Sequence, residues 1–163
     1  ILSDSGLVTL TGGKWTTFRK MGEDTVDYFE QVTGEKPKES SSANMKIQGN
    51  TTQPEAGHWG VYGTDAKAIH SLAESHPEWK EKIHPDFPNI LAEVIWAIRN
   101  EMAVKVDDVL SRRIRMLILD AQAAIDSAPK IAELMAKEMK KDEVWIENEL
   151  TEFGKTAKKY LIK

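Results

Sequence analysis

The sequence predicts a mainly α-helical protein in which one unpaired β-strand and one helix precede a small helical domain. After residue 60, apolar residues recur at helical spacing, and prolines divide the chain into short segments. Near the start, residues 6–10 have the composition of a strand, which runs into the turn pair Gly12-Gly13. No second strand-like run lies near them. A lone strand leaves its backbone donors and acceptors unpaired, so we expect its sheet to lie outside this sequence.

The first helix is predicted over residues 14–32, because Phe18, Met21 and Phe29 fall on one face. Gly22 lowers the stability of this helix by about 1 kcal/mol relative to alanine. A closely packed neighbour would explain why a glycine stands there. The strand and this helix carry apolar surface that does not face anything in the same stretch. We expect another domain or a second chain to cover it.

Residues 33–60 have the composition of a linker. Beyond it, apolar spacing and capping residues predict helices over residues 64–73, 89–102, 106–111, 115–126 and 142–161. Asn89 and Asp142 are the expected caps of two of them, and Ser127-Ala128-Pro129 has the pattern of a further helix start. The predicted division is a terminal strand and helix over 1–36, followed by linker and helical domain over 37–163.

Composition and charge exclude several classes of protein. The net charge of −4, with acidic and basic residues interspersed, argues against nucleic-acid binding. The absence of cysteine excludes disulfides and thiolate chemistry and suits a reducing compartment. No apolar run approaches the roughly 20 residues that span a bilayer.

The clearest chemical signal is the stretch Thr11-Gly12-Gly13-Lys14-Trp15-Thr16-Thr17. Two glycines at a strand-to-helix junction let another molecule approach the backbone closely. The first amides of the helix have no intrahelical partner, so this end favours an anion or an oxygen that gains negative charge. Lys14 adds a full charge, and the hydroxyls of Thr16 and Thr17 can cap the helix or bind a ligand. The alternative is a capped helix start with a surface lysine, and the residues alone do not decide between the two.

No other pattern matches a catalytic or metal-binding arrangement. The spacings of a phosphate loop and of a Gly-x-Gly-x-x-Gly fingerprint are absent, so we do not expect this chain alone to bind a nucleotide. The histidines lack metal-ligand spacing, and a solvated or capping role is predicted for them: His58, His70, His76 and His84.

Arg112, Arg113 and Arg115 could clamp a phosphate through their guanidinium groups. Aspartates lie nearby in the sequence, however, and we therefore predict internal salt bridges that fix the turn between two helices. The tryptophans are expected to be core or interface anchors: Trp59, Trp79, Trp96 and Trp145.

Residues 6–21 closely resemble the segment that closes the flavin site in FAD-dependent, aerobic-type glycerol-3-phosphate dehydrogenases: Gly6-Leu7-Val8-Thr9-Leu10-Thr11-Gly12-Gly13-Lys14-Trp15-Thr16-Thr17-Phe18-Arg19-Lys20-Met21. The chain after them is similar to that family's carboxy-terminal domain. The pieces that carry the similarity are Tyr62-Gly63-Thr64-Asp65-Ala66, Glu93-Val94-Ile95-Trp96-Ala97-Ile98-Arg99-Asn100-Glu101-Met102-Ala103, Asp108-Val109-Leu110-Ser111-Arg112-Arg113-Ile114-Arg115 and Leu119-Asp120-Ala121-Gln122-Ala123-Ala124.

The resemblance implies a flavoenzyme that oxidises sn-glycerol 3-phosphate to dihydroxyacetone phosphate and passes electrons to FAD and then to quinone, or to dioxygen in oxidase relatives. It implies that Gly13, Lys14, Trp15, Thr16 and Thr17 bind the cofactor, with their backbone at the pyrimidine edge of the flavin. Lys14 would also lie beside the substrate. No catalytic residue and no metal ligand is expected in this chain.

The family's amino-terminal FAD fingerprint and its other substrate-binding residues are absent from the sequence. We therefore expect the chain alone to bind no FAD and to turn over no substrate. The implied partners are the missing amino-terminal FAD-binding domain, with glycerol 3-phosphate and quinone in the parent enzyme, and a homo-oligomer stays open. The implied location is cytoplasmic, at the cytoplasmic membrane surface in quinone-linked members. Two alternatives remain, namely a non-catalytic helical interaction or dimerisation domain and an oxidase that uses dioxygen.

Overall fold

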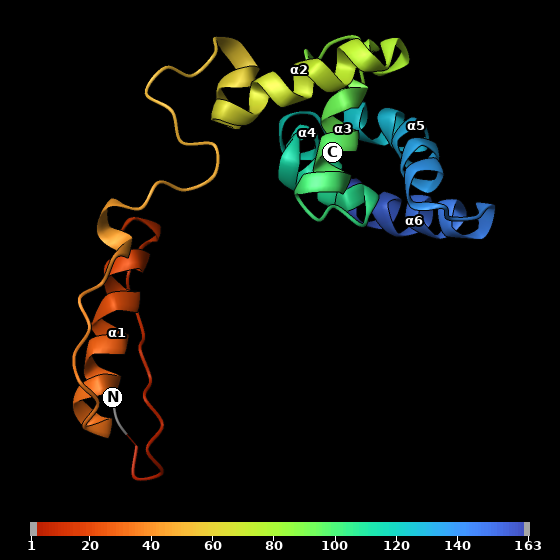
Figure 1. Ribbon diagram of the computed structural model, residues 1–163. Coiled ribbons are helices and arrows are strands. Elements are labelled where there is room, and N and C mark those ends of the chain that lie inside the picture. Colours follow the sequence, from red (N-terminus) through yellow and green to blue (C-terminus); the bar gives the residue numbers. More distant parts are fainter. Residues whose placement is uncertain (1–2, 162–163) are drawn as a thin grey trace. The chain divides into compact units, whose positions relative to one another are not determined.

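The computed structural model describes residues 3–161 and is mainly helical (Figure 1). The chain divides into two compact units, residues 1–48 and residues 49–163. The predicted fold class is confirmed, because helices dominate both units and sheet structure is almost absent from the described residues. The predicted assignment of residues 1–36 and 37–163 to two parental domains stays a prediction.

The first unit is built around helix α1 (Phe18–Thr33), which follows a single 3-10 turn, Trp15–Thr17. The predicted helix is therefore confirmed. It ends at Gly34, whose left-handed φ of 72° lets its N–H donate to the carbonyl of Glu30. The chain runs extended beside α1 both before and after the helix (Figure 1).

Residues 7–10 do not join a sheet within the described chain, and only Val8 is paired as a β-bridge residue. The segment is extended, as predicted, but the described residues contain no partner strand with which it forms a ladder. The return segment is held to the helix by side chains of α1. The backbone N–H of Lys38 donates to Oε2 of Glu30 over 3.1 Å, and Arg19 donates to the hydroxyl of Ser42 over 3.2 Å.

The first unit has no apolar core of its own. In the described part of residues 1–48, Glu30 is the one buried residue. The apolar face predicted for α1 is present but exposed, with Phe18 at 60% and Phe29 at 47% exposure. Nothing in the described chain packs against Gly22, since a methyl group added there meets no atom within 4 Å. The closely packed neighbour expected at Gly22 is thus not supplied by these residues.

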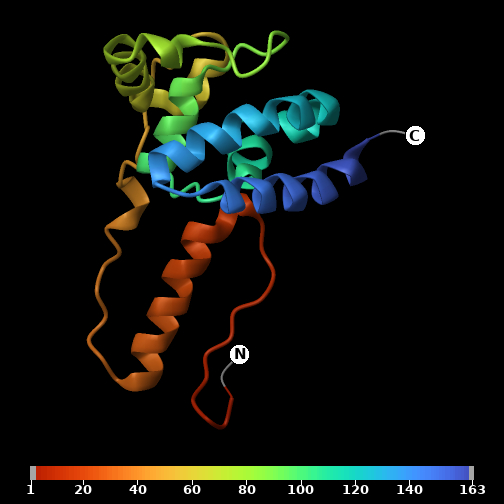
Figure 2. The ribbon, with the colours of Figure 1, turned by 90° about the vertical axis from the view of Figure 1, so that its right-hand side faces the viewer.

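The second unit contains the hydrophobic core. Its helices are α2 (Ala66–Ser75), α3 (Leu91–Asn100), α4 (Met116–Leu119), α5 (Ala121–Met139) and α6 (Glu143–Ala157). α5 and α6 run side by side (Figure 2), and α3 contacts α2 and α5. Fully buried side chains come from α3, α4, α5 and the stretch between α3 and α4, among them Ile95, Leu110, Met116, Ile131 and Met135. The apolar spacing that predicted helices 89–102 and 142–161 therefore marks the faces that form this core.

Two predicted helix starts need correction. The helix predicted over residues 115–126 is interrupted at Asp120, and the helix expected to begin at Ser127 instead begins at Ala121 as α5. The carboxylate of Asp120 accepts from the N–H of Ala123 over 2.9 Å and caps α5. Pro129 lies inside α5 rather than in its first turn. An interior proline costs about 3 kcal/mol. The buried neighbours Ala128 and Ile131 tie this stretch to the core and offset that cost.

The second correction concerns Asn89, which does not cap α3. The N-cap position belongs to Ile90, whose N–H donates to Oε1 of Glu93 from within the helix over 2.7 Å. The predicted cap Asp142 is confirmed, because its carboxylate accepts from the N–H of Trp145 over 2.9 Å. The predicted short helix at 106–111 lies in place, but most of it forms a π-helical turn, Asp108–Arg113.

The start of the second unit is fixed by a close approach of two glycines. Gly63 has a φ of 55° and a ψ of −124°, which residues with a side chain rarely adopt. A methyl group on it would lie 1.8 Å from the carbonyl oxygen of Gly49. That same oxygen accepts from the N–H of Thr64 over 3.1 Å.

Gly63→Ala should therefore lower the free energy of unfolding of the second unit by about 1–3 kcal/mol, through strain and loss of this hydrogen bond. Chemical denaturation measures the change. The matched control is Gly154→Ala within α6, where an added methyl group meets no atom within 4 Å. The control should leave stability unchanged or raise it by up to about 1 kcal/mol. Equal stabilities of the two variants would contradict the role given to Gly63.

Candidate flavin-contacting site

The predicted site residues lie together at the amino-terminal end of α1. Gly12 and Gly13 have left-handed φ angles of 85° and 93°, so the chain turns sharply before the helix. Lys14 follows in an extended conformation with φ of −131° and ψ of 163°. A methyl group on Gly13 would lie 2.0 Å from the sulfur of Met21, so a side chain at this position would displace Met21. The turn thus keeps bare backbone at the helix start.

Thr17 has a capping role in this structure. Its hydroxyl oxygen accepts from the backbone N–H of Lys14 over 2.9 Å and lies 3.0 Å from the Lys14 carbonyl, to which it can donate. Sequence reasoning left capping and ligand binding open for the two threonines, and the structure assigns capping to Thr17. The side chains of Lys14, Trp15 and Thr16 remain exposed.

A pocket of about 480 Å³ surrounds this turn. It is lined by the glycine turn, by Lys14 and by residues of α1: Leu10, Gly12, Gly13, Lys14, Trp15, Phe18, Met21 and Gly22. The rings of Trp15 and Phe18 stack with centroids 5.1 Å apart, which gives the pocket a flat apolar wall. Gly22 contributes no side chain and so leaves space beside that wall. The pocket combines bare backbone, a cation and aromatic rings.

The two lysines nearest this end of α1 differ in their electrostatic surroundings. The ammonium group of Lys20 pairs with Glu23 over 2.6 Å and with Asp24 over 2.9 Å, and these hydrogen bonds raise its pKa. Within residues 3–161, Lys14 has no carboxylate partner. Lys14 therefore offers an uncompensated positive charge at a helix amino terminus.

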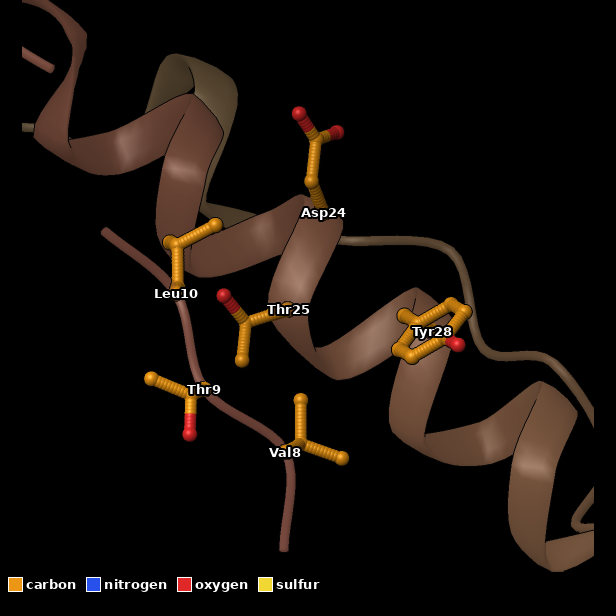
Figure 3. Close-up of a pocket in the computed structure, with 6 residues that line it drawn as sticks. All are labelled: Val8, Thr9, Leu10, Asp24, Thr25 and Tyr28. Atoms are coloured by element: carbon orange, nitrogen blue, oxygen red, sulfur yellow. The ribbon is translucent and has the colours of Figure 1, made fainter. Parts of the chain in front are cut away.

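A second, smaller pocket of about 230 Å³ lies between the extended segment and α1 (Figure 3). It is lined by Val8, Thr9, Leu10, Asp24, Thr25 and Tyr28. The hydroxyl of Thr25 already donates to the carbonyl of Met21 over 2.7 Å. Figure 3 shows the carboxylate of Asp24 pointing away from the extended segment. This space is therefore a packing gap rather than a site for chemistry.

The salt bridges predicted for the arginine-rich stretch are confirmed for Arg112 and Arg113, whereas Arg115 forms none among the residues that the structure describes. Arg112 pairs with Asp107 and, over 3.2 Å, with Asp108. Arg113 lies 3.8 Å from the Glu101 carboxylate and 3.9 Å from that of Asp108. The predicted role of the tryptophans is also confirmed, because all four belong to the core or pack against it.

A buried carboxylate that sequence reasoning missed lies at the start of α3. Glu93 is 1% exposed, and its Oε2 accepts from the hydroxyl of Tyr62 over 2.7 Å and from the amide of Asn89 over 2.8 Å. The ring nitrogen Nε2 of His58 lies 3.4 Å from Oε1, is buried, and has no hydrogen-bond partner. The solvated role expected for the histidines is thus wrong for His58. A glutamate four residues after Asn89 inside an apolar run is the sequence signal for such a group.

The comparisons place these features in a family of proteins. The model of the C-terminal domain of alpha-glycerophosphate oxidase matches residues 8–145, and the chain belongs to that family. No solved structure matches the chain.

The relatives carry related names. A mitochondrial glycerol-3-phosphate dehydrogenase of Bos taurus is 32% identical over 98% of this chain and 24% of its own length. A probable mitochondrial glycerol-3-phosphate dehydrogenase of Dictyostelium discoideum is 33% identical over 98% of this chain and 27% of its own length. The chain therefore spans about a quarter of the curated relatives it matches. Within the described residues, no helix is both long and apolar enough to cross a membrane.

Tyr62→Phe should lower the free energy of unfolding by about 1–3 kcal/mol, because the buried carboxylate of Glu93 loses one of its hydrogen-bond donors. Tyr160→Phe is the matched control, since Tyr160 is 52% exposed. Denaturant unfolding of both variants measures the difference. A Tyr62→Phe protein as stable as the Tyr160→Phe protein would contradict the hydrogen bond to Glu93.

Stability should also fall at high pH through Tyr62. Burial raises the pKa of the Tyr62 hydroxyl above its usual value, and the Glu93 carboxylate raises it further. The unfolded chain therefore loses this proton first, near pH ~10, while the folded chain keeps it. The stabilisation is complete below that pH and declines as the pH rises above it. Ultraviolet titration of tyrosinate should show one tyrosine that ionises only on unfolding, and its loss in Tyr62→Phe identifies the residue.

Proposed function

We propose that the parent protein oxidises sn-glycerol 3-phosphate to dihydroxyacetone phosphate with FAD, and that this chain supplies the turn that closes the flavin site. The reaction removes a hydride from the secondary carbon and a proton from its hydroxyl group, and bound FAD would accept the two electrons. Electrons then pass to quinone. Membership of the family, together with an exposed cationic turn at the start of α1, supports this proposal.

The residues of the turn suit the flavin they would contact. Left-handed Gly12 and Gly13 keep side chains away, so a planar ring can approach the backbone of residues 13–17. The amide groups and dipole of the helix start would stabilise negative charge on a flavin bound there. Trp15 and Phe18 are exposed and stacked, and would offer it an aromatic surface.

Lys14 takes a second role beside the substrate. Its ammonium group has no partner in the described chain, and it is therefore available to hold an anionic or oxygen-bearing end of glycerol 3-phosphate. No residue of this chain is proposed to accept the proton or the hydride. Quinone is the proposed acceptor of the electrons from FAD, and dioxygen is the alternative acceptor. Cytoplasmic location, at the membrane surface for a quinone-linked enzyme, belongs to the same proposal.

The test of Lys14 uses the intact parent enzyme. Lys14→Ala should lower kcat/KM for glycerol 3-phosphate by about 10- to 100-fold, as expected for the loss of one charge-assisted contact to an anion. Lys14→Arg should recover part of the loss. Lys20→Ala is the matched control, because that lysine is already paired with two carboxylates of α1. An unchanged kcat/KM in Lys14→Ala would remove Lys14 from the site.

The chain on its own should bind no FAD and turn over no substrate, because a turn and one helix enclose only one edge of a flavin. Purified chain should show no flavin absorbance after incubation with FAD and gel filtration. Flavin recovered in stoichiometric amount would refute this expectation. The intact parent, purified in the same way, is the positive control.

A further inference from the structure

Thr17 holds both polar groups of the Lys14 backbone with one hydroxyl group. Its Oγ1 accepts from the N–H of Lys14 over 2.9 Å and lies 3.0 Å from the Lys14 carbonyl, to which it can donate. The backbone N–H of Thr17 donates to the same carbonyl over 2.9 Å. Three contacts therefore join the two residues, and two of them need the hydroxyl group of Thr17.

The conformation of Lys14 makes this bridge possible. With a φ of −131° and a ψ of 163°, the residue is extended. In an extended residue the N–H and C=O groups point to the same side, as they do where two residues pair in a sheet. One hydroxyl group reaches both only while Lys14 keeps this conformation. The bridge therefore fixes φ and ψ of Lys14, and with them the direction in which its side chain leaves the backbone.

The two residues before Lys14 do little to hold it in place. Gly12 and Gly13 lack a Cβ atom, so each can adopt many backbone conformations at little cost. A chain that enters a helix through two glycines needs a restraint after them if the following side chain is to keep one position. Thr17 supplies this restraint from the first turn, Trp15–Thr17.

Met21 also lies against the Thr17 hydroxyl group. Its sulfur is 3.5 Å from Oγ1 of Thr17 and fills the space that a side chain on Gly13 would need. The hydroxyl group has one proton, and the Lys14 carbonyl is the closer and stronger acceptor, since a thioether accepts weakly. Thr17 does not line the pocket at this turn, whereas Lys14 does. The Thr17 side chain therefore acts on a ligand in the pocket through the residues that it holds, and Lys14 is the one with a charge.

We propose that Thr17 is a positioning residue whose hydroxyl group orients Lys14 toward the substrate. The inference rests on the proposed function, in which Lys14 holds an anionic or oxygen-bearing end of glycerol 3-phosphate. The ammonium group of a lysine sits on a flexible four-carbon stem, so a fixed backbone limits the positions that it can reach. Thr17 touches neither the substrate nor the reacting atoms in this role.

The experiment uses the intact parent enzyme with its flavin bound. Thr17→Val keeps the branched shape and removes the hydroxyl group, and it should lower kcat/KM for glycerol 3-phosphate by about three- to tenfold, the range for one neutral hydrogen bond. The change should lie in KM with kcat unchanged, because Lys14 would hold the substrate in the ground state and the transition state alike. Thr17→Ser keeps the hydroxyl group and should restore KM.

A double-mutant cycle with Lys14 separates positioning from a purely structural role. In the Lys14→Ala enzyme, Thr17→Val should cause no further loss, because the side chain that Thr17 orients is gone. Thr33→Val is the matched control. The Thr33 hydroxyl donates to the carbonyl of Phe29 over 2.9 Å at the other end of α1, and its removal should leave KM and kcat unchanged.

The outcomes distinguish this inference from the proposed function. If Lys14→Ala lowers kcat/KM and Thr17→Val does not, the inference alone is overturned. An unchanged kcat/KM in Lys14→Ala overturns the role of Lys14 and the inference together. A further loss from Thr17→Val in the Lys14→Ala enzyme, or a lower kcat at unchanged KM, also overturns the inference. Thr17→Ala takes the place of Thr17→Val if that variant does not retain flavin, and loss of flavin from both assigns Thr17 a structural role instead.

Discussion

A carboxylate that is removed from water needs hydrogen-bond donors to its oxygens, and buried Glu93 of the second unit has this requirement. Ionised and buried without partners, it would cost several kcal/mol. It obtains one donor from the backbone at Ile90, one from Asn89 and one from Tyr62. The last of these comes from a segment about thirty residues earlier, so satisfying Glu93 also docks residues 57–65 onto α3. In this docked segment, position 63 needs a glycine, because a side chain there would clash with the backbone of Gly49.

The first unit shows the opposite condition, and the candidate site depends on it. Its helix carries an apolar face and a strand-like segment, but the described residues provide neither a core nor a partner strand. A helix of 16 residues is marginal in water without tertiary packing. Exposed aromatic rings, bare glycine backbone and an unpaired lysine are costly features for a segment that stands alone. They are the features expected of a surface that another part of a protein covers, which agrees with the proposed function.

The sequence predicts the helical units well wherever a local signal decides the structure. Apolar spacing locates α1, α3 and α6, and Asp142 caps its helix because the side chain needs only the amides three residues ahead. Prediction fails where a distant contact overrides the local signal. Pro129 has the pattern of a helix start, yet Asp120 caps first and core burial carries α5 through the proline. Asn89 has the pattern of a cap, yet its amide is taken by buried Glu93.

The candidate site divides in the same way. The glycine turn and Lys14 could be located from sequence, because backbone conformation and charge at a helix start are local properties. That Thr17 caps the turn, whereas Lys14 stays unpaired and Lys20 does not, depends on side-chain packing along α1 that no spacing rule supplies.

The two units therefore differ in how far their polar groups find partners within the chain. Residues 49–161 satisfy most of their buried polar groups internally, with Nε2 of His58 as an exception, and substitutions there act first on stability. Residues 12–17 leave charge and backbone unsatisfied, so substitutions there act on whatever completes the surface. The contacts that a covering partner would make with this surface are also the contacts that would stabilise the fold of the first unit. Under the proposed function, a flavin site closed by this segment would be complete only once the rest of the enzyme has folded against it, and catalytic competence would then depend on assembly.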